Sequence, residues 1–236
     1  MENTLGLRAT KSTGTPKGVM LTHYNLVANS NQISALFARY DETPADAVCI
    51  EPSKEKVLAA IPYFHVYGMM TAMLNPIASG NEIVMLPNPR DLPGVLGAID
   101  KEKITVSPLV PKLIQALDEH PKNAKDYLKS RKAKWYQNTF ADKSIKGLAL
   151  GVVKETTKCL TDVFTAVTKY PLLRDFSLTS IKGVVSGGAA LATGTLKSFE
   201  KSVGRENIII QGYGMSEASP LVATNPGHGK NKPLQG

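Results

Sequence analysis

The sequence predicts a layered α/β fold with a mostly parallel sheet. Five short runs rich in β-branched residues end in glycine, proline or a small polar residue, which is typical of strands buried on both faces of a sheet. Longer segments with helical spacing lie between them, and this alternation favours parallel strands joined by helices. The predicted strands are residues 57–61, 82–86, 104–106, 181–185 and 207–210.

The predicted helices follow in the same order. Thr22 is a candidate N-cap for a helix whose apolar residues include Leu26, Ile33 and Phe37. Three further segments with helical patterns cover residues 91–101, 110–117 and 193–203.

Residues 122–175 interrupt the alternation of strands and helices. Residues 122–182 contain 13 Lys and Arg against 5 Asp and Glu, whereas the rest of the chain has 15 of each, so the net charge of +8 belongs to this stretch. Within it, residues 142–170 show a basic amphipathic pattern, which predicts a helix packed on its own domain or, alternatively, a helix on an anionic membrane surface. Trp135 and Tyr136 are the only adjacent pair of aromatic residues in this stretch, and we expect no nucleic-acid partner.

The composition argues against several other classes. No run approaches the roughly 18 apolar residues of a membrane-spanning helix. The first residues lack the basic and apolar regions of a secretory signal. Cys49 and Cys159 match no metal or redox spacing, so we expect a reduced, cytoplasmic setting, with peripheral membrane contact through residues 142–170 as the alternative.

Residues 12–23 (STGTPKGVMLTH) have the composition of a phosphate-binding loop. Glycine lets the backbone approach phosphate closely, small hydroxyls donate hydrogen bonds, and Lys17 supplies positive charge. The Walker pattern Gly-x4-Gly-Lys-Ser/Thr is absent, so this is a different kind of loop. On composition alone, an ordinary turn is the alternative.

Residues 211–217 (QGYGMSE) have the residue types of a nucleotide site with a metal ion. Tyr213, between two glycines, can lie flat against a purine ring. The Ser216 hydroxyl can donate to a phosphate, and the Glu217 carboxylate can hold Mg²⁺, which prefers hard oxygen ligands. Together with the Lys17 loop, this motif predicts a bound nucleoside triphosphate.

Two shorter segments lie between these motifs. Residues 63–69 (YFHVYGM) contain His65, and a histidine of this kind on its own is more often a core histidine than a catalytic one. Residues 185–191 (VSGGAAL) place Gly187 and Gly188 at a strand-to-helix turn, a weak signal by itself.

All four segments resemble those of the adenylate-forming, or AMP-binding, superfamily. Its phosphate loop reads Thr-Ser-Gly-Thr-Thr-Gly-x-Pro-Lys-Gly-Val, and its later motifs read Ser-Gly-Gly-Ala-x-Leu and Tyr-Gly-x-Thr-Glu. The flanking residues 88–94 and 219–226 are similar to bacterial-type long-chain fatty acid–CoA ligases. The resemblance covers residues 12–121 and about 175–236; residues 1–11 match nothing in the family, and residues 122–175 look like an insertion.

The resemblance implies a two-step reaction that uses ATP, Mg²⁺ and coenzyme A. A fatty acid carboxylate attacks the α-phosphate of ATP and releases pyrophosphate, and coenzyme A then captures the acyl adenylate. The implied catalytic residues are Lys17, His65 and Glu217, with Glu217 also the metal ligand. The implied nucleotide-binding residues are Ser12, Thr13, Gly14, Lys17, Gly187, Gly188, Gly212, Tyr213, Gly214 and Ser216.

The resemblance also implies that residues 12–236 form part of a large N-terminal domain. The family's Thr-Gly-Asp segment and small C-terminal domain are absent, so we expect a piece of a longer enzyme that does not complete thioester formation alone. Two alternatives stay open: another adenylate-forming ligase, such as a fatty-acyl-AMP or aryl-CoA ligase, and a non-catalytic nucleotide-binding or membrane-associated protein. Lys11, where the family's loop has its first glycine, favours the second alternative.

Overall fold

The computed structural model describes residues 4–9, 17–38, 48–119 and 176–225 of the chain. The chain divides into two compact units, Met1–Glu119 with Leu178–Gly236, and His120–Ser177. Every helix and strand described below belongs to the first unit. The predicted insertion (residues 122–175) and the predicted membrane-contacting segment (residues 142–170) lie outside the described residues.

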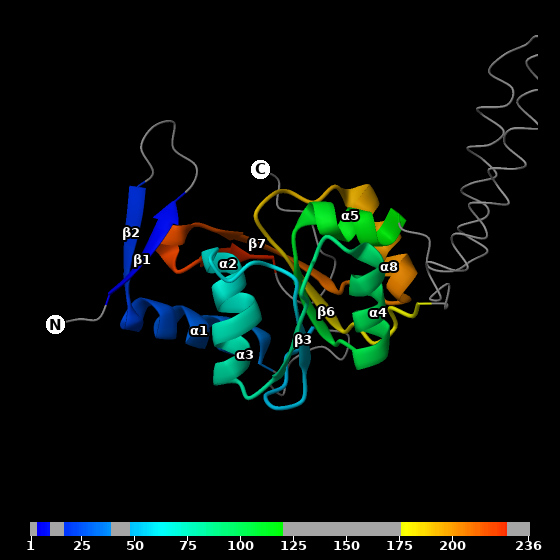
Figure 1. The fold of residues 1–236 in the computed structure, drawn as a ribbon, viewed down its shortest axis with the longest axis horizontal. Helices are drawn as coiled ribbons and strands as arrows, with labels where there is room; N and C mark the ends of the chain where they lie inside the picture. Colours follow the sequence, from blue (N-terminus) through cyan, green and yellow to red (C-terminus); the bar gives the residue numbers. More distant parts are fainter. Residues whose placement is uncertain (1–3, 10–16, 39–47, 120–175, 226–236) are drawn as a thin grey trace, which may run out of the picture. The chain divides into compact units, whose positions relative to one another are not determined.

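The first unit is built around a six-stranded sheet of order β4-β3-β5-β6-β7-β8 (Figure 1). The first five strands in this order run parallel, and β8 is antiparallel to β7. The fold class predicted from the sequence is therefore confirmed. The strands are β3 (Lys56–Ala59), β4 (Glu82–Met85), β5 (Val106–Leu109), β6 (Gly183–Ser186), β7 (Ile209–Gly214) and β8 (Leu221–Thr224).

Burial on both faces explains why these runs form central strands. The adjacent residues Val57 and Leu58 point to opposite faces of β3, and both are buried; the same holds for Ile209 and Ile210 in β7. The predicted strand 104–106 was placed too early, because Ile104 instead donates its N–H to Ile99 and completes the end of the preceding helix.

Helices cover the two faces of the parallel strands. Helices α4 (Leu92–Glu102), α5 (Pro111–Glu119) and α8 (Thr193–Val203) contact one another in that order. The other group consists of α1 (His23–Phe37), the short α2 (Val66–Met69), the π-helical turn η1 (Met70–Leu74) and α3 (Asn75–Ala78). Figure 1 shows the two groups on opposite sides of β3 and β6. Among the described residues, no helix combines the length and the apolar character needed to cross a membrane.

A separate two-stranded hairpin precedes α1. Strand β1 (Thr4–Ala9) pairs antiparallel with β2 (Lys17–Thr22), so that Ala9 lies opposite Lys17. The sequence predicted a phosphate loop here but no strands. The predicted N-cap is confirmed: the Thr22 side chain accepts the Asn25 N–H at 3.2 Å, and the Asn25 side chain accepts the Thr22 N–H at 2.9 Å.

Candidate functional site

The fold brings the two outermost motifs of the sequence into contact. Strand β2, which begins at Lys17, contacts η2, a 3-10 turn at Ser216–Ala218 that contains Ser216 and Glu217. Of Lys17 the structure describes the backbone, and the predicted phosphate-binding residues Ser12, Thr13 and Gly14 lie outside the described residues. The strand that follows the predicted phosphate loop thus lies beside the predicted metal-binding turn.

An apolar cluster holds the same strand against the His65 segment. Leu21 of β2 and Leu26 of α1 pack with Val66, Met69 and Met70, and all five are buried. Because Val66 directly follows His65, this cluster fixes the histidine near β2.

His65 is an exposed residue at the N-terminus of α2, not a buried core histidine. Its Nδ1 accepts the N–H of Tyr67 at 3.1 Å, which caps the helix. Because Nδ1 is the acceptor, the neutral ring carries its proton on Nε2, which can donate to an acceptor outside the protein. Phe64, the preceding residue, is 85% exposed. The segment therefore presents a hydrogen-bond donor and an aromatic face to solvent.

Tyr67 joins the His65 segment to the Gly187–Gly188 turn. Its hydroxyl donates to the Val185 carbonyl at 2.7 Å and also lies 3.2 Å from the Leu109 carbonyl, so it bridges the ends of β6 and β5. Burial raises the pKa of the Tyr67 phenol, which therefore remains a donor. A Cβ added at Gly187 would lie 3.2 Å from Cζ of Tyr67. Close approach of this ring is thus one physical reason for a glycine at position 187.

Gly188 completes the same turn. Its φ of +86° is a conformation that side chains with a Cβ rarely adopt. The backbone of the exposed residues 188–190 is thereby turned away from β6 before α8 begins. The resemblance predicted both glycines as site residues, but Tyr67 was not among the predicted site residues. The position of Tyr67, two residues after His65, was the signal that could have identified it.

Gln211 fixes the ends of three neighbouring strands. It lies opposite Ser186 in the β6–β7 register, and its Oε1 accepts the N–H of Leu191 at 3.4 Å. Its own N–H donates to Oδ1 of Asn225 at 2.6 Å. The buried Gln211 side chain therefore ties the Gly187–Gly188 turn to the strand that carries Tyr213. Gln211 belongs to the predicted motif, but its sequence position predicted no function for it.

Tyr213 is 56% exposed near the end of β7, so one face of its ring is accessible to a planar ligand. The fold itself restricts the two flanking positions. A Cβ on Gly214 would collide with the carbonyl oxygen of Pro220, and a Cβ on Gly212 would lie 3.2 Å from Cδ1 of Leu221. The return of the chain into β8 thus requires glycine at position 214 and leaves little room for a side chain at position 212.

Glu217 is exposed in the first turn of η2. Within the described part of the chain, no group of three His, Cys, Asp or Glu residues could hold a metal ion. A single carboxylate still fits Mg²⁺, because this ion is commonly held by one or two carboxylates together with substrate phosphates and waters. Ser216 adds a hydroxyl beside it. The arrangement suits a metal that arrives with a phosphorylated ligand, and it does not suit a free-standing metal centre.

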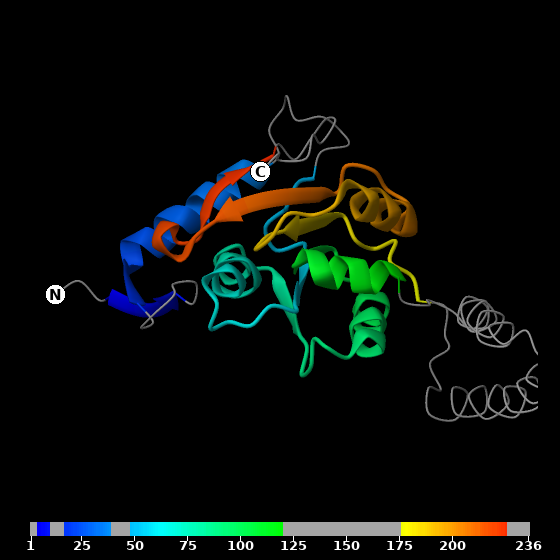
Figure 2. The same ribbon diagram turned by 90° about the horizontal axis from the view of Figure 1, so that it is seen from above.

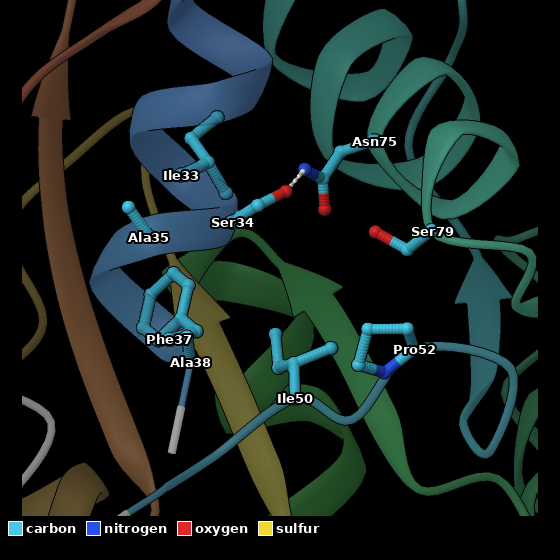
Figure 3. A pocket seen from close by; sticks show the side chains of 9 residues that line it. All are labelled: Ile33, Ser34, Ala35, Phe37, Ala38, Ile50, Pro52, Asn75 and Ser79. Atoms are coloured by element: carbon cyan, nitrogen blue, oxygen red, sulfur yellow. Dashed lines mark hydrogen bonds between the residues drawn. The ribbon is translucent and has the colours of Figure 1, made fainter. Parts of the chain in front are cut away.

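One pocket of the described structure lies away from these residues. A cavity of about 280 Å³ opens between α1, α3 and residues 50–52, and none of the predicted site residues lines it (Figure 3). Asn75 donates to Ser34 Oγ at 3.0 Å at its edge. The described candidate residues at the ends of β3, β6 and β7, which include His65, Gly187 and Tyr213, therefore lie outside this cavity.

Comparisons with known proteins agree with this arrangement. A family model described as AMP-binding enzyme matches residues 12–236. A long-chain-fatty-acid–CoA ligase of Bacillus subtilis (strain 168) is 32% identical over 222 residues, which cover 94% of this chain and 28% of the relative. The chain thus spans less than a third of that relative's length.

Solved structures show the same fold. ATP-bound MatB from Rhodopseudomonas palustris has a TM-score of 0.62 at 18% identity, covering 97% of this chain and 32% of that one. A fatty acyl-adenylate ligase from L. pneumophila, solved with acyl adenylate and pyrophosphate, has a TM-score of 0.61 at 20% identity, covering 94% of this chain and 30% of that one.

Proposed function

Because this chain belongs to the AMP-binding enzyme family, we propose that the protein uses ATP to activate a long-chain fatty acid, first to an acyl adenylate and then to acyl-CoA. The observation that carries the proposal is the contact between β2 and η2. It unites a lysine-bearing strand with a turn that offers a hydroxyl and a carboxylate. The 32% identity to a long-chain-fatty-acid–CoA ligase supports the choice of acid.

Each part of the proposed reaction has a candidate group. A carboxylate oxygen of the fatty acid bonds to the α-phosphorus of ATP, and the bond from that phosphorus to the bridging oxygen of pyrophosphate breaks. Negative charge then accumulates on the leaving group, where Lys17 and the hydroxyls of its loop would stabilise it. Mg²⁺ would be held by Glu217 and would neutralise phosphate charge. In the second step, the thiolate of coenzyme A attacks the acyl carbonyl carbon and displaces AMP.

The remaining residues would position the substrates. Tyr213 would stack on adenine, with Gly212 and the Gly187–Gly188 turn allowing the ligand to approach the backbone. The Nε2–H of His65 would donate a hydrogen bond near the reacting carboxylate. Cytoplasmic localisation, with membrane contact through residues 142–170 as the alternative, remains a prediction from the sequence.

ATP–pyrophosphate exchange tests the proposal in the natural protein that contains this chain. We expect exchange that depends on long-chain fatty acids and falls by about 100-fold or more in Lys17→Met, because a charge-stabilising group is lost. Lys197→Met, at an exposed lysine of α8, is the matched control and should retain exchange. Exchange with aromatic acids alone would instead favour an aryl-CoA ligase, and nucleotide binding without any exchange would favour a non-catalytic protein.

A further inference from the structure

Asn29 makes an unusual long-range connection in the described structure. Its Nδ2 donates to the carbonyl oxygen of Leu221 at 3.0 Å, and its Oδ1 accepts the N–H of Leu221 at 3.2 Å. The second Nδ2 hydrogen is directed to Oε1 of Gln32 at 3.1 Å. Asn29 is 4% exposed, and it is separated from Leu221 by 192 residues.

The geometry of β8 explains why an amide fits here. The N–H and C=O of one strand residue point to the same side, so both polar groups of Leu221 can face the free edge of the sheet. Asn29 provides one donor and one acceptor in the same plane, and it pairs with Leu221 as a neighbouring strand would. Figure 2 shows α1 beside β8, the red strand at this edge.

The two elements joined by this amide are each next in the chain to one of the two outermost motifs of the candidate site. Helix α1 directly follows β2, whose first residue is Lys17, and β8 closely follows η2, which contains Glu217. The apolar cluster of Leu21 and Leu26 ties β2 and α1 to α2 and η1, and none of its members belongs to β8. Asn29 therefore supplies a directional contact between the phosphate-side and metal-side elements.

We propose that Asn29 is a positioning residue that sets the spacing between the Lys17 end and the Glu217 end of the nucleotide site. This inference rests on the proposed function, since it needs a ligand that spans both ends. MgATP does so, because its phosphates would reach Lys17 while its metal would contact Glu217. Adenosine would occupy only the Tyr213 platform, which β7 holds within the sheet.

The expected effect is consequently selective. Loss of the amide should weaken MgATP binding by about tenfold, the size expected for two net hydrogen bonds that fix one geometry. Adenosine binding should change by less than about twofold. A purely structural role for Asn29 would weaken both ligands alike or lower only the thermal stability.

The test compares Asn29→Ala with Asn31→Ala by calorimetric titration with MgATP and with adenosine. Asn31 is an exposed residue of the same helix, so the control carries the same change in side chain without the contact to Leu221. A tenfold rise in the ratio of the MgATP Kd to the adenosine Kd in Asn29→Ala, with an unchanged ratio in Asn31→Ala, supports the inference. An unchanged ratio in Asn29→Ala overturns it.

Hydrogen exchange at the Leu221 amide provides a second measurement, and it does not depend on whether a substituted chain folds. In the unsubstituted chain, MgATP should slow this exchange more than saturating adenosine does, because only MgATP would contact both the Lys17 and the Glu217 motifs. Equal slowing would contradict a positioning role. If the unsubstituted chain binds neither ligand, the proposed function fails and this inference fails with it, whereas binding with an unchanged ratio refutes Asn29 alone.

Discussion

The contact between Gly187 and the ring of Tyr67 allows a quantitative prediction. A Cβ at position 187 would lie 3.2 Å from Cζ and 3.4 Å from both Cε atoms of that ring. Carbon atoms in favourable contact are about 3.5 to 4.0 Å apart, so the ring must move by a few tenths of an ångström. The ring is held in place, because its hydroxyl donates to the Val185 carbonyl at 2.7 Å.

Gly187→Ala should therefore lower the free energy of unfolding by about 2 kcal/mol. The overpacking of a well-filled site costs about 1 to 3 kcal/mol, and weakening the Tyr67 hydrogen bond adds up to about 1 kcal/mol. Urea unfolding of the chain measures this change as a lower midpoint at an unchanged slope. Gly194→Ala is the control: no atom lies within 4 Å of its added Cβ, and alanine is the better helix former in α8.

A double-mutant cycle tests the cause of the loss. Tyr67→Leu removes the ring atoms that face position 187, so Gly187→Ala should cost less than about 0.5 kcal/mol in that background. If Gly187→Ala costs the same with leucine as with tyrosine at position 67, ring contact is not the reason for this glycine, and the reasoning is refuted.

Three further predictions concern other polar groups. Burial raises the pKa of Glu200, so the native state keeps the proton on this carboxyl to a higher pH than the unfolded chain does. The contribution of Glu200 to stability therefore falls as the pH rises through that raised pKa. Glu200→Gln keeps an acceptor for the Ile208 N–H and should remove this fall in urea unfolding, followed upward from the ordinary pKa of glutamate, whereas an unaltered pH profile would contradict it. Lys182 Nζ lies 3.2 Å from the fully buried carboxylate of Glu55. Lys182→Met should therefore lower the free energy of unfolding by about 1 to 3 kcal/mol, less than for a fully buried pair because Lys182 is 42% exposed. Adding Glu55→Gln should recover part of this loss. His65→Asn should retain the cap of α2 and an unchanged thermal midpoint, but it should lose the ATP–pyrophosphate exchange that depends on fatty acid. Retained exchange would remove His65 from the catalytic residues.

Local sequence patterns were sufficient where one element alone determines the outcome. Residues 193–203 were predicted as a helix, and α8 has these bounds. Thr22 could be predicted as an N-cap because its side chain accepts a hydrogen bond from a residue only three positions later in the chain. The central strands were recognisable because burial on both faces produces continuous apolar runs.

Elements that depend on distant partners were not predictable in this way. Strand β8 is short, its residue Val222 is exposed, and it exists through its pairing with β7 and its contact with Asn29. The same limit applies within the candidate site. The pairing of Tyr67 with Gly187 joins segments whose proximity depends on the order β3-β5-β6 in the sheet.

The topology also separates the candidate site into two structurally different parts. His65, Gly187 and Tyr213 follow or end the parallel strands β3, β6 and β7, whose carboxyl ends meet at one edge of the sheet. Parallel order alone places these three residues together, as it does for ligand sites in other open α/β sheets. Strand β2 belongs to no part of that sheet and reaches the site through an apolar cluster, its contact with η2 and the Asn29 amide. The phosphate end and the adenine platform therefore depend on different contacts, which is why MgATP and adenosine are expected to respond differently to the loss of Asn29.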